Sequence, residues 1–482
     1  MFSSISLGAR ARPRPGRVTT SARFFSSTKT APSHWARNAV VGGLITGPAL
    51  YWATSSRDEK PSVSLTGVPG VPRLDTPPTE HLTFGPGLSR DQVTQIISQN
   101  AYSVPVSEIS GVSRYDGTQW ASNSPCEDRF FHGQFPSPWN DGKQWMAWAV
   151  FDGHAGWQTA ELLKHKLLPY VRHSLDQVRS DEKVPAERVQ EALVQGFLNL
   201  DAAIFKAAED ASRSDEPLQD RSQKMEPAWA GSCALLSILD STTNTLHVAC
   251  TGDSRALLGQ QRPDGTWEAI PLSVDQSGSN EEEVARLQQE HPGEENIVKD
   301  GRVLGIMVSR AFGDSRWKWP LDLQTEMHKR FYAPAPLTPR YDVRTPPYLT
   351  AEPVVTSTKI DPSRPSFLIM ASDGLWDNLS SEQAVGLMGK WLGSPSGKRS
   401  PSSPTASRGP RDFVFGKGVE ERFVEERTTV QDDNAAVHLT RNSLGGNQHE
   451  LIAGRLGFGS PFSRYARDDI TVQVVFFHDL QR

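Results

Sequence analysis

Residues 145–156 read WMAWAVFDGHAG and give the clearest indication of the fold. The run Trp145–Phe151 is apolar throughout and ends at an Asp-Gly turn, a pattern typical of a buried strand. The carboxylate of Asp152 is therefore expected at the end of that strand. Because Asp-Gly is also a common turn with no chemical role, this stretch alone does not establish a functional site.

Two further aspartates lie at the ends of equally apolar runs far along the chain. Asp373 follows Phe367–Ser372, and Asp468 precedes Ile470–Phe477. Mg²⁺ and Mn²⁺ prefer oxygen ligands such as carboxylates, carbonyls and water, and they leave positions free for a nucleophilic water. Carboxylates gathered at strand ends therefore predict a site for such cations.

Short motifs around these aspartates occur in one order along the chain. They are EDR at 127–129, FDGHAG at 151–156, GS at 231–232, GDSRA at 252–256, SRAFGD at 309–314, ASDGLWD at 371–377 and DDITV at 468–472. In that order they resemble the metal-dependent serine/threonine protein phosphatases of type 2C. The resemblance extends from about Ser107 to Phe477, nearly four fifths of the chain.

The resemblance implies an α+β fold, in which a central antiparallel β-sandwich is flanked by pairs of helices and a dinuclear metal centre lies at one end. Hydrophobic periodicity independently indicates strands in runs with helices in pairs between them, which suggests α+β layers. It predicts helices within 89–99, 158–175, 185–208 and 273–290, and strands within 145–151, 231–239, 246–251, 255–259, 367–372 and 470–477.

The resemblance also implies the ligands of two Mg²⁺ or Mn²⁺ ions. Asp152 would bridge the two ions. The Gly153 carbonyl and Glu127 would complete one site, and Asp373 and Asp468 the other. Several carboxylates would offset the repulsion between two close cations, and a hydroxide bridging them would attack the phosphorus of a phosphoserine in line. No phosphoenzyme intermediate would then be required.

Other residues near these motifs receive candidate roles. His154 would protonate the departing serine oxygen, which suits a group that titrates near neutral pH. Asp128 would hold a metal-bound water. A packed histidine and a turn-stabilising aspartate are the respective alternatives. Asp253 is expected to support a strand end, whereas Asp314 and Asp377 are candidates for a third, weaker metal site or for structural turns.

Three further segments resemble the pyruvate dehydrogenase phosphatase group within the type 2C family. They are KWPLDLQ at 318–324, TPPYLTAEP at 345–353 and DNAAVHL at 433–439. The expected substrate is therefore the phosphorylated E1α subunit of the pyruvate dehydrogenase complex. Another mitochondrial phosphoprotein and a non-catalytic phosphoprotein-binding scaffold are the alternatives, although a scaffold would not need the predicted metal ligands.

One position departs from the type 2C pattern. Type 2C enzymes commonly carry a phosphate-binding arginine four residues before the glutamate that matches Glu127, and this chain has Asn123 there. The pyruvate dehydrogenase phosphatase group resembles this chain in the same position. Asn123 and Arg129 are therefore the candidate substrate-binding residues, and a plain surface arginine is the alternative for Arg129.

The N-terminal region has the composition of a targeting segment. Residues 1–37 are rich in arginine and serine, and no acidic residue precedes Asp58. This composition predicts a mitochondrial presequence, with a basic tail as the alternative. The uncharged segment 38–56 approaches the roughly 20 residues that span a bilayer. It is either a membrane tether or part of the leader, so the matrix and the inner membrane or intermembrane space both stay open.

The rest of the chain is divided by composition. Residues 57–100 are expected to form a linker and a short helix, and 101–482 the phosphatase domain. Insertions are expected near 316–348, rich in proline and aromatic residues, and near 393–411, rich in serine, proline and basic residues. The first is either a flap over the active-site mouth or a packed loop.

Charge and cysteine content exclude several classes of function. The formal net charge of −5 gives no reason to expect nucleic-acid binding, so the partners are expected to be proteins. Three cysteines without Cys-x-x-Cys spacing argue against a disulfide framework or a zinc site. Cysteine-dependent phosphatases need an arginine six residues after the cysteine, and those positions here hold His132, Leu239 and Ala256.

Overall fold

The computed structural model describes residues 87–107, 109, 111–139, 141–178, 184–394 and 423–478. The predicted presequence 1–37, the segment 38–56 and most of the insertion near 393–411 lie outside the described residues. All described residues fall within the unit Thr83–Arg482. Within these residues, every helix is too short or too polar to cross a membrane.

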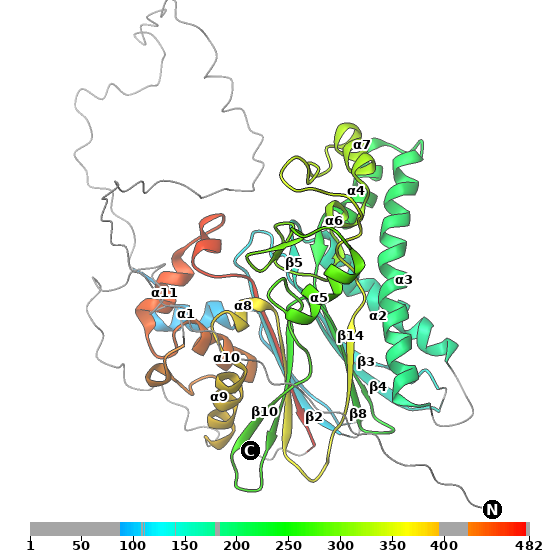
Figure 1. Ribbon diagram of the computed structural model, residues 1–482. Helices are drawn as coiled ribbons and strands as arrows, with labels where there is room; N and C mark the ends of the chain where they lie inside the picture. Colours follow the sequence, from blue (N-terminus) through cyan, green and yellow to red (C-terminus); the bar gives the residue numbers. More distant parts are fainter. Residues whose placement is uncertain are drawn as a thin grey trace, which may run out of the picture. The chain divides into compact units, whose positions relative to one another are not determined.

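Two antiparallel sheets form the centre of the molecule (Figure 1). The six-stranded sheet has the order β1-β2-β16-β15-β9-β10, and the five-stranded sheet the order β14-β8-β7-β4-β3. The strands of the first are β1 Tyr102–Pro105, β2 Val112–Trp120, β16 Ile470–Phe477, β15 Ser366–Ala371, β9 Arg255–Gln261 and β10 Trp267–Pro271. Those of the second are β14 Val354–Lys359, β8 Thr245–Thr251, β7 Ala234–Asp240, β4 Gln144–Phe151 and β3 Arg129–Pro136.

Strand β4 shows why the decisive stretch is apolar at every position. Met146, Trp148 and Val150 pack in the cluster shared by the two sheets. Trp145 and Phe151 point to the opposite face, where they pack in a cluster with the helices. Because successive side chains of a strand point to opposite faces, a strand covered on both sides needs an uninterrupted apolar run.

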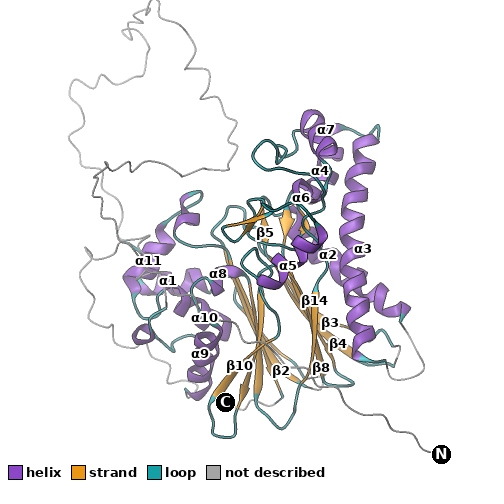
Figure 2. Ribbon diagram, viewed as in Figure 1, coloured by secondary structure: helices purple, strands orange, loops and turns teal. Residues whose placement is uncertain are grey.

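Helices cover the outer face of each sheet, so the layers are helix, sheet, sheet, helix (Figure 2). The five-stranded sheet is covered by α2 Gln158–Gln177, α3 Ala186–Arg213 and α4 Leu218–Trp229. The six-stranded sheet is covered by α1 Arg90–Ile97, α8 Asp373–Trp376, α9 Ser381–Gly393, α10 Ala435–Leu444 and α11 His449–Gly457. The predicted α+β sandwich with flanking helices is confirmed.

The individual predicted elements also occur where the periodicity placed them. The apolar stripe of α3 is buried, and its five predicted positions are Val189, Leu193, Phe197, Leu200 and Ile204. Helix α1 begins at a capping box in which the Ser89 hydroxyl accepts from the backbone of Gln92. The predicted helix within 273–290 is α5, Glu281–Glu290. The short pieces β5 Gly153–His154, β6 Gly231–Ser232 and β13 Phe312–Gly313 form a separate small sheet.

The insertion near 316–348 packs against the rest of the domain. It contains α6 Ser315–Lys318 and α7 Leu321–Phe331, and its aromatic side chains Trp319 and Tyr348 are buried. The Trp319 ring contacts the Phe205 ring of α3 edge-on at 5.7 Å. These contacts match the packed-loop alternative for the described residues.

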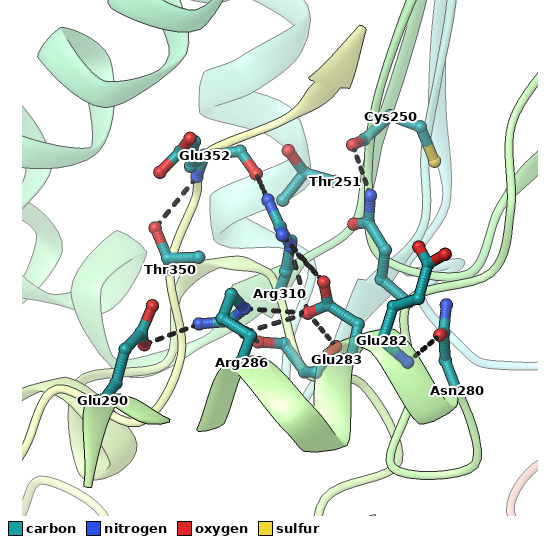
Figure 3. A network of polar contacts seen from close by, with 12 residues as sticks. Cys250, Thr251, Asn280, Glu282, Glu283, Arg286, Glu290, Arg310, Thr350 and Glu352 are labelled. Atoms are coloured by element: carbon teal, nitrogen blue, oxygen red, sulfur yellow. Dashed lines mark hydrogen bonds and ion pairs between the residues drawn. The ribbon is translucent and has the colours of Figure 1, made fainter. Parts of the chain in front are cut away.

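A buried ionic network ties helix α5 to the motif SRAFGD (Figure 3). The Glu283 carboxylate accepts from Arg310 Nη2 at 2.7 Å and from Ser309 Oγ at 2.7 Å. Arg286 Nη2 donates to the same carboxylate at 2.8 Å. Arg310 Nη1 also donates to the carbonyl of Glu352 at 2.8 Å. The network therefore holds the start of the motif in place before the chain reaches Asp314.

Candidate metal centre

Three aspartates from distant parts of the chain meet at one end of the sandwich. Asp152 follows β4, Asp253 follows β8, and Asp373 begins α8 directly after β15. One carboxylate oxygen from each lies within 4.8 Å of those of the other two. The backbone amide of Asp373 also points at Asp152 Oδ2, 3.4 Å away. The predicted pair Asp152 and Asp373 is thus brought together.

Asp253 was expected to support a strand end, and the structure instead places its carboxylate in the aspartate cluster. The Cys233 thiol donates to Asp253 Oδ1 at 3.3 Å. The signal in the sequence is the same one that singled out Asp152. In both cases an aspartate beside a glycine ends an apolar run, here Leu246–Thr251.

The cluster is electrostatically strained without a cation. Burial, followed by the charge of Asp373, raises the pKa of Asp152 well above its ordinary value. Burial and the charge of Asp253 do the same for the pKa of Asp373. Like charges in a poorly solvated site oppose ionisation, and a divalent cation relieves that repulsion. The all-oxygen donor set suits Mg²⁺ or Mn²⁺ rather than a softer metal.

The backbone of Glu127 passes close to Gly153, the residue that follows Asp152. A Cβ added at Gly153 would lie 2.4 Å from the Glu127 carbonyl oxygen, so only glycine permits the approach. The Glu127 amide donates to Asp469 Oδ2 at 2.8 Å, which holds the loop. Burial is the main cause that raises the pKa of the Glu127 carboxyl.

Asp128 is buried beside the ends of β15 and β16. Its Oδ2 accepts from the hydroxyls of Ser372, at 2.8 Å, and Thr471, at 2.7 Å. Burial, then the charge of Asp469, raises the pKa of Asp128 to about 7. These bonds join the residue before β3 to the end of β15 and the start of β16. The role of Asp128 in holding a metal-bound water stays a prediction.

His154 is paired with Asp314. Its Nε2 lies 2.6 Å from Asp314 Oδ2, and the Asp314 side chain is 1% exposed. Burial by itself would lower the pKa of His154, but the charge and hydrogen bond of Asp314 raise it. A Cβ at Gly231 would lie 2.1 Å from His154 Nε2, so the pair needs glycine there. The structure thus pairs Asp314, a candidate ligand of a third metal ion, with His154.

Asp468 and Asp377 lie at the edge of the cluster. Asp468 forms an ion pair with Arg464, and its Oδ1 accepts from the Asp469 amide at 2.7 Å. Burial raises the pKa of Asp468 and Arg464 opposes that rise. The pKa of Asp377 is raised by burial and then by the charges of Asp468 and Asp253.

The two candidate substrate-binding residues make contacts within the protein. The Asn123 amide donates to Glu127 Oε2 at 3.1 Å and to Asp469 Oδ2 at 3.0 Å. Arg129 Nη1 donates to the carbonyls of Cys126, at 2.7 Å, and Asp128, at 2.8 Å. Arg129 Nε also pairs with Glu161 on α2. Both side chains hold the loop that carries Glu127.

Residues 117–420 match the family profile described as Protein phosphatase 2C. A protein phosphatase 2C homolog of Schizosaccharomyces pombe is 40% identical over 407 residues, which cover 82% of this chain and 86% of that protein. The mitochondrial [pyruvate dehydrogenase [acetyl-transferring]]-phosphatase 1 of Saccharomyces cerevisiae is 36% identical, covering 78% of this chain and 70% of its own length. The human protein of the same name is 30% identical, with 81% and 83% covered.

Proposed function

This chain belongs to the protein phosphatase 2C family, and from that premise we propose that its substrate is a phosphoserine on the E1α subunit of the pyruvate dehydrogenase complex. The family assignment makes the chain a serine/threonine protein phosphatase acting on phosphoproteins. Dephosphorylation by this enzyme would return E1α to its active form.

Two observations support this substrate. Relatives in yeast and in mammals carry the name pyruvate dehydrogenase phosphatase, and each covers about four fifths of this chain. The segments 318–324, 345–353 and 433–439 also resemble that group. Two of these segments pack in the described structure, where Trp319 and Tyr348 are buried.

The proposed metal ligands are those that the resemblance assigned. Asp152, Glu127, the Gly153 carbonyl, Asp373 and Asp468 would hold two Mg²⁺ or Mn²⁺ ions. Asp253, with Asp373, is the proposed ligand of a third, weaker ion, because its carboxylate lies in the same cluster. Bound divalent cations supply an activated water and stabilise charge on the phosphoryl group.

The side chains of the protein supply the remaining chemistry. His154 donates a proton to the serine oxygen as the P–O bond breaks, and Asp314 keeps the imidazole protonated and oriented for that transfer. Asp128 keeps the strand ends in register through Ser372 and Thr471. The carboxylates exclude other anions from the site unless cations are bound, so activity requires the metal.

The proposed location is the mitochondrion, reached through a presequence in residues 1–37, with the catalytic domain in residues 101–482. The names of the Saccharomyces cerevisiae and human relatives describe them as mitochondrial. Residues 1–57 fused to a fluorescent protein are expected to give a mitochondrial signal. A diffuse cytosolic signal would remove the location and, with it, the proposed substrate.

The decisive experiment is phosphate release from phosphorylated pyruvate dehydrogenase complex by the full-length chain with Mg²⁺ or Mn²⁺. We expect release at least tenfold faster than from an unrelated phosphoprotein. Asp373→Ala should abolish it, whereas Asp210→Ala, at an exposed ion pair on α3, should leave it unchanged. Equal rates on the two substrates would discard the pyruvate dehydrogenase assignment while leaving the phosphatase activity in place.

A further inference from the structure

The loop between α11 and β16 presents an arginine to the metal centre. This loop, Phe458–Arg467, lies in the red part of the chain in Figure 1 and ends directly before Asp468. It contains Arg464, whose side chain is 47% exposed and whose Nη1 pairs with Asp468 Oδ1. The flanking Phe462 and Tyr465 are 63% and 80% exposed, so the loop is open to a protein substrate.

Neighbouring residues fix this loop on both sides of Arg464. The Ser463 hydroxyl donates to the Ser122 carbonyl at 2.5 Å, and the Ser122 hydroxyl donates to the Arg467 carbonyl at 2.9 Å. The Arg467 guanidinium lies over the Trp120 ring, 4.1 Å from its centroid. With Ser463 and Arg467 held, the position of the Arg464 backbone between them is set.

Arg464 also interacts with the other carboxylates of the centre. Burial by itself would lower the pKa of its guanidinium. The charges of Asp468, Glu127, Asp469 and Asp373 outweigh burial, so the pKa is raised overall. Arg464 in turn opposes the rise in the pKa of Glu127. The ion pair places the guanidinium beside Asp468, a proposed ligand of one of the metal ions.

Two other arginines near the site, Arg129 and Arg255, are held by protein groups. Arg129 is engaged by Glu161 and by two backbone carbonyls. Arg255 makes a two-pronged ion pair with Asp275, at 3.0 and 2.6 Å, and lies over the Trp376 ring. Asn123, at the position where the family commonly has its phosphate-binding arginine, donates its amide hydrogens to Glu127 and Asp469.

We propose that Arg464 binds the phosphate of the substrate in place of the arginine that Asn123 replaces. This inference rests on the phosphatase activity proposed above but not on the identity of the substrate. A guanidinium has five N–H donors in a planar fork that matches two phosphate oxygens. One N–H pairs with Asp468, which leaves donors on the exposed side for a phosphoserine. The positive charge also offsets repulsion between the phosphate dianion and the aspartates.

Binding of inorganic phosphate to the full-length, Mn²⁺-loaded protein tests the proposal by calorimetry. We expect Arg464→Ala to weaken binding at least tenfold. Arg464→Lys should weaken it at least threefold, because the charge remains but the fork is lost. Arg188→Ala, at an exposed ion pair on α3, should match the wild type. Mn²⁺ should bind Arg464→Ala at least as tightly as the wild type, since a cation next to Asp468 has been removed.

An affinity of Arg464→Ala for phosphate within twofold of the wild type would overturn the proposal, and so would a wild type that binds no phosphate. If the alanine variant does not fold, Arg464→Lys decides, and unchanged binding by that variant would overturn the proposal. Failure on the pyruvate dehydrogenase complex would leave the phosphate titration unaffected. The two proposals therefore fail separately.

Discussion

The carboxylate of Asp314 lies 2.6 Å from Nε2 of His154, although 160 residues separate the two along the chain. Asp314 is almost completely buried, and its negative charge raises the pKa of His154 against the effect of burial. A raised pKa lets a histidine keep its proton to higher pH, which suits general acid catalysis. The pair brings the motif FDGHAG and the motif SRAFGD together in space.

Replacing this carboxylate should weaken the acid. Asp314→Asn removes the charge, so the pKa of His154 falls and less of it is protonated at pH 7. We expect kcat at pH 7 to drop roughly 10- to 100-fold. The basic limb of the kcat profile should move to lower pH. Rates from pH 5.5 to 9 on a phosphoserine peptide would check this, with Asp322→Asn, an exposed aspartate on α7, as the control. An unmoved limb would contradict the assigned role.

The aspartate cluster should destabilise the metal-free protein. Asp373→Asn removes one of several mutually repelling buried charges, so the melting temperature after chelation should rise above that of the wild type. Mn²⁺ at about 100 times its Kd should stabilise the wild type by about 2.7 kcal/mol and this variant much less. Differential scanning fluorimetry measures both changes.

The control for this prediction is Asp210→Asn, at an exposed ion pair with Lys206 on α3. It should leave both melting temperatures unchanged. If chelated Asp373→Asn melted below the chelated wild type, repulsion within the cluster would not be the dominant effect.

The network around Glu283 should contribute strongly to stability. Glu283→Gln leaves Arg310 and Arg286 without their buried carboxylate, and removing one partner of a buried pair costs roughly 3–5 kcal/mol. Urea unfolding would measure the loss. The neighbouring Glu282→Gln is a matched control, because Glu282 is exposed on the same turn of α5 (Figure 3). Equal unfolding midpoints for the two variants would show that the network contributes little.

Acid should destabilise the protein partly through His247. This residue is 3% exposed, and burial lowers its pKa to about 4. The unfolded chain takes up this proton below about pH 6.5. His247 therefore does not lower the free energy of unfolding above about pH 6.5. As the pH falls from 6.5 toward 4, the unfolded chain takes up a proton that the folded chain does not, and the free energy of unfolding decreases. Two to three pKa units correspond to roughly 3 kcal/mol.

Unfolding midpoints measured between pH 7 and 4 would test this contribution. His247→Gln should show a shallower loss of stability than the wild type over that range. His173→Gln, at an exposed histidine of α2, should follow the wild type. Parallel curves for all three proteins would exclude His247 as a cause.

The elements that local pattern predicted are present, but strands such as β2, β3 and β14 and helices such as α9 and α10 were not predicted. Strand β4 is apolar from Trp145 to Phe151, β16 is apolar except at Thr471 and Gln473, and α3 carries its apolar residues at helical spacing, so each could be identified without its neighbours. Strand β10 is only partly buried, and its residues 267–271 show neither a continuous run nor a clear alternation. Its place at the sheet edge depends on pairing with β9, which no local pattern records.

The site was predicted less completely than the fold. Asp152 and Asp373 were placed together because each ends a strand, and the structure brings them together. Asp253 has the same local pattern, but it joins the cluster because β8 pairs with β7, and this pairing is not encoded in the local sequence. Arg464 has no local signal, because its orientation depends on contacts of Ser463 and Arg467 with residues more than 300 positions away.

The sequence alone identified Asp152, His154 and Asp373 as candidates and placed the two aspartates at the ends of apolar runs, because side-chain type and hydrophobic period are local properties. Only the tertiary structure decided which carboxylates lie together, which aspartate faces His154 and which arginine pairs with Asp468. The physical reason is that charge repulsion, hydrogen bonding and burial act over a few ångströms in space. Residues such as His154 and Asp314 come within that range only after the two sheets have packed.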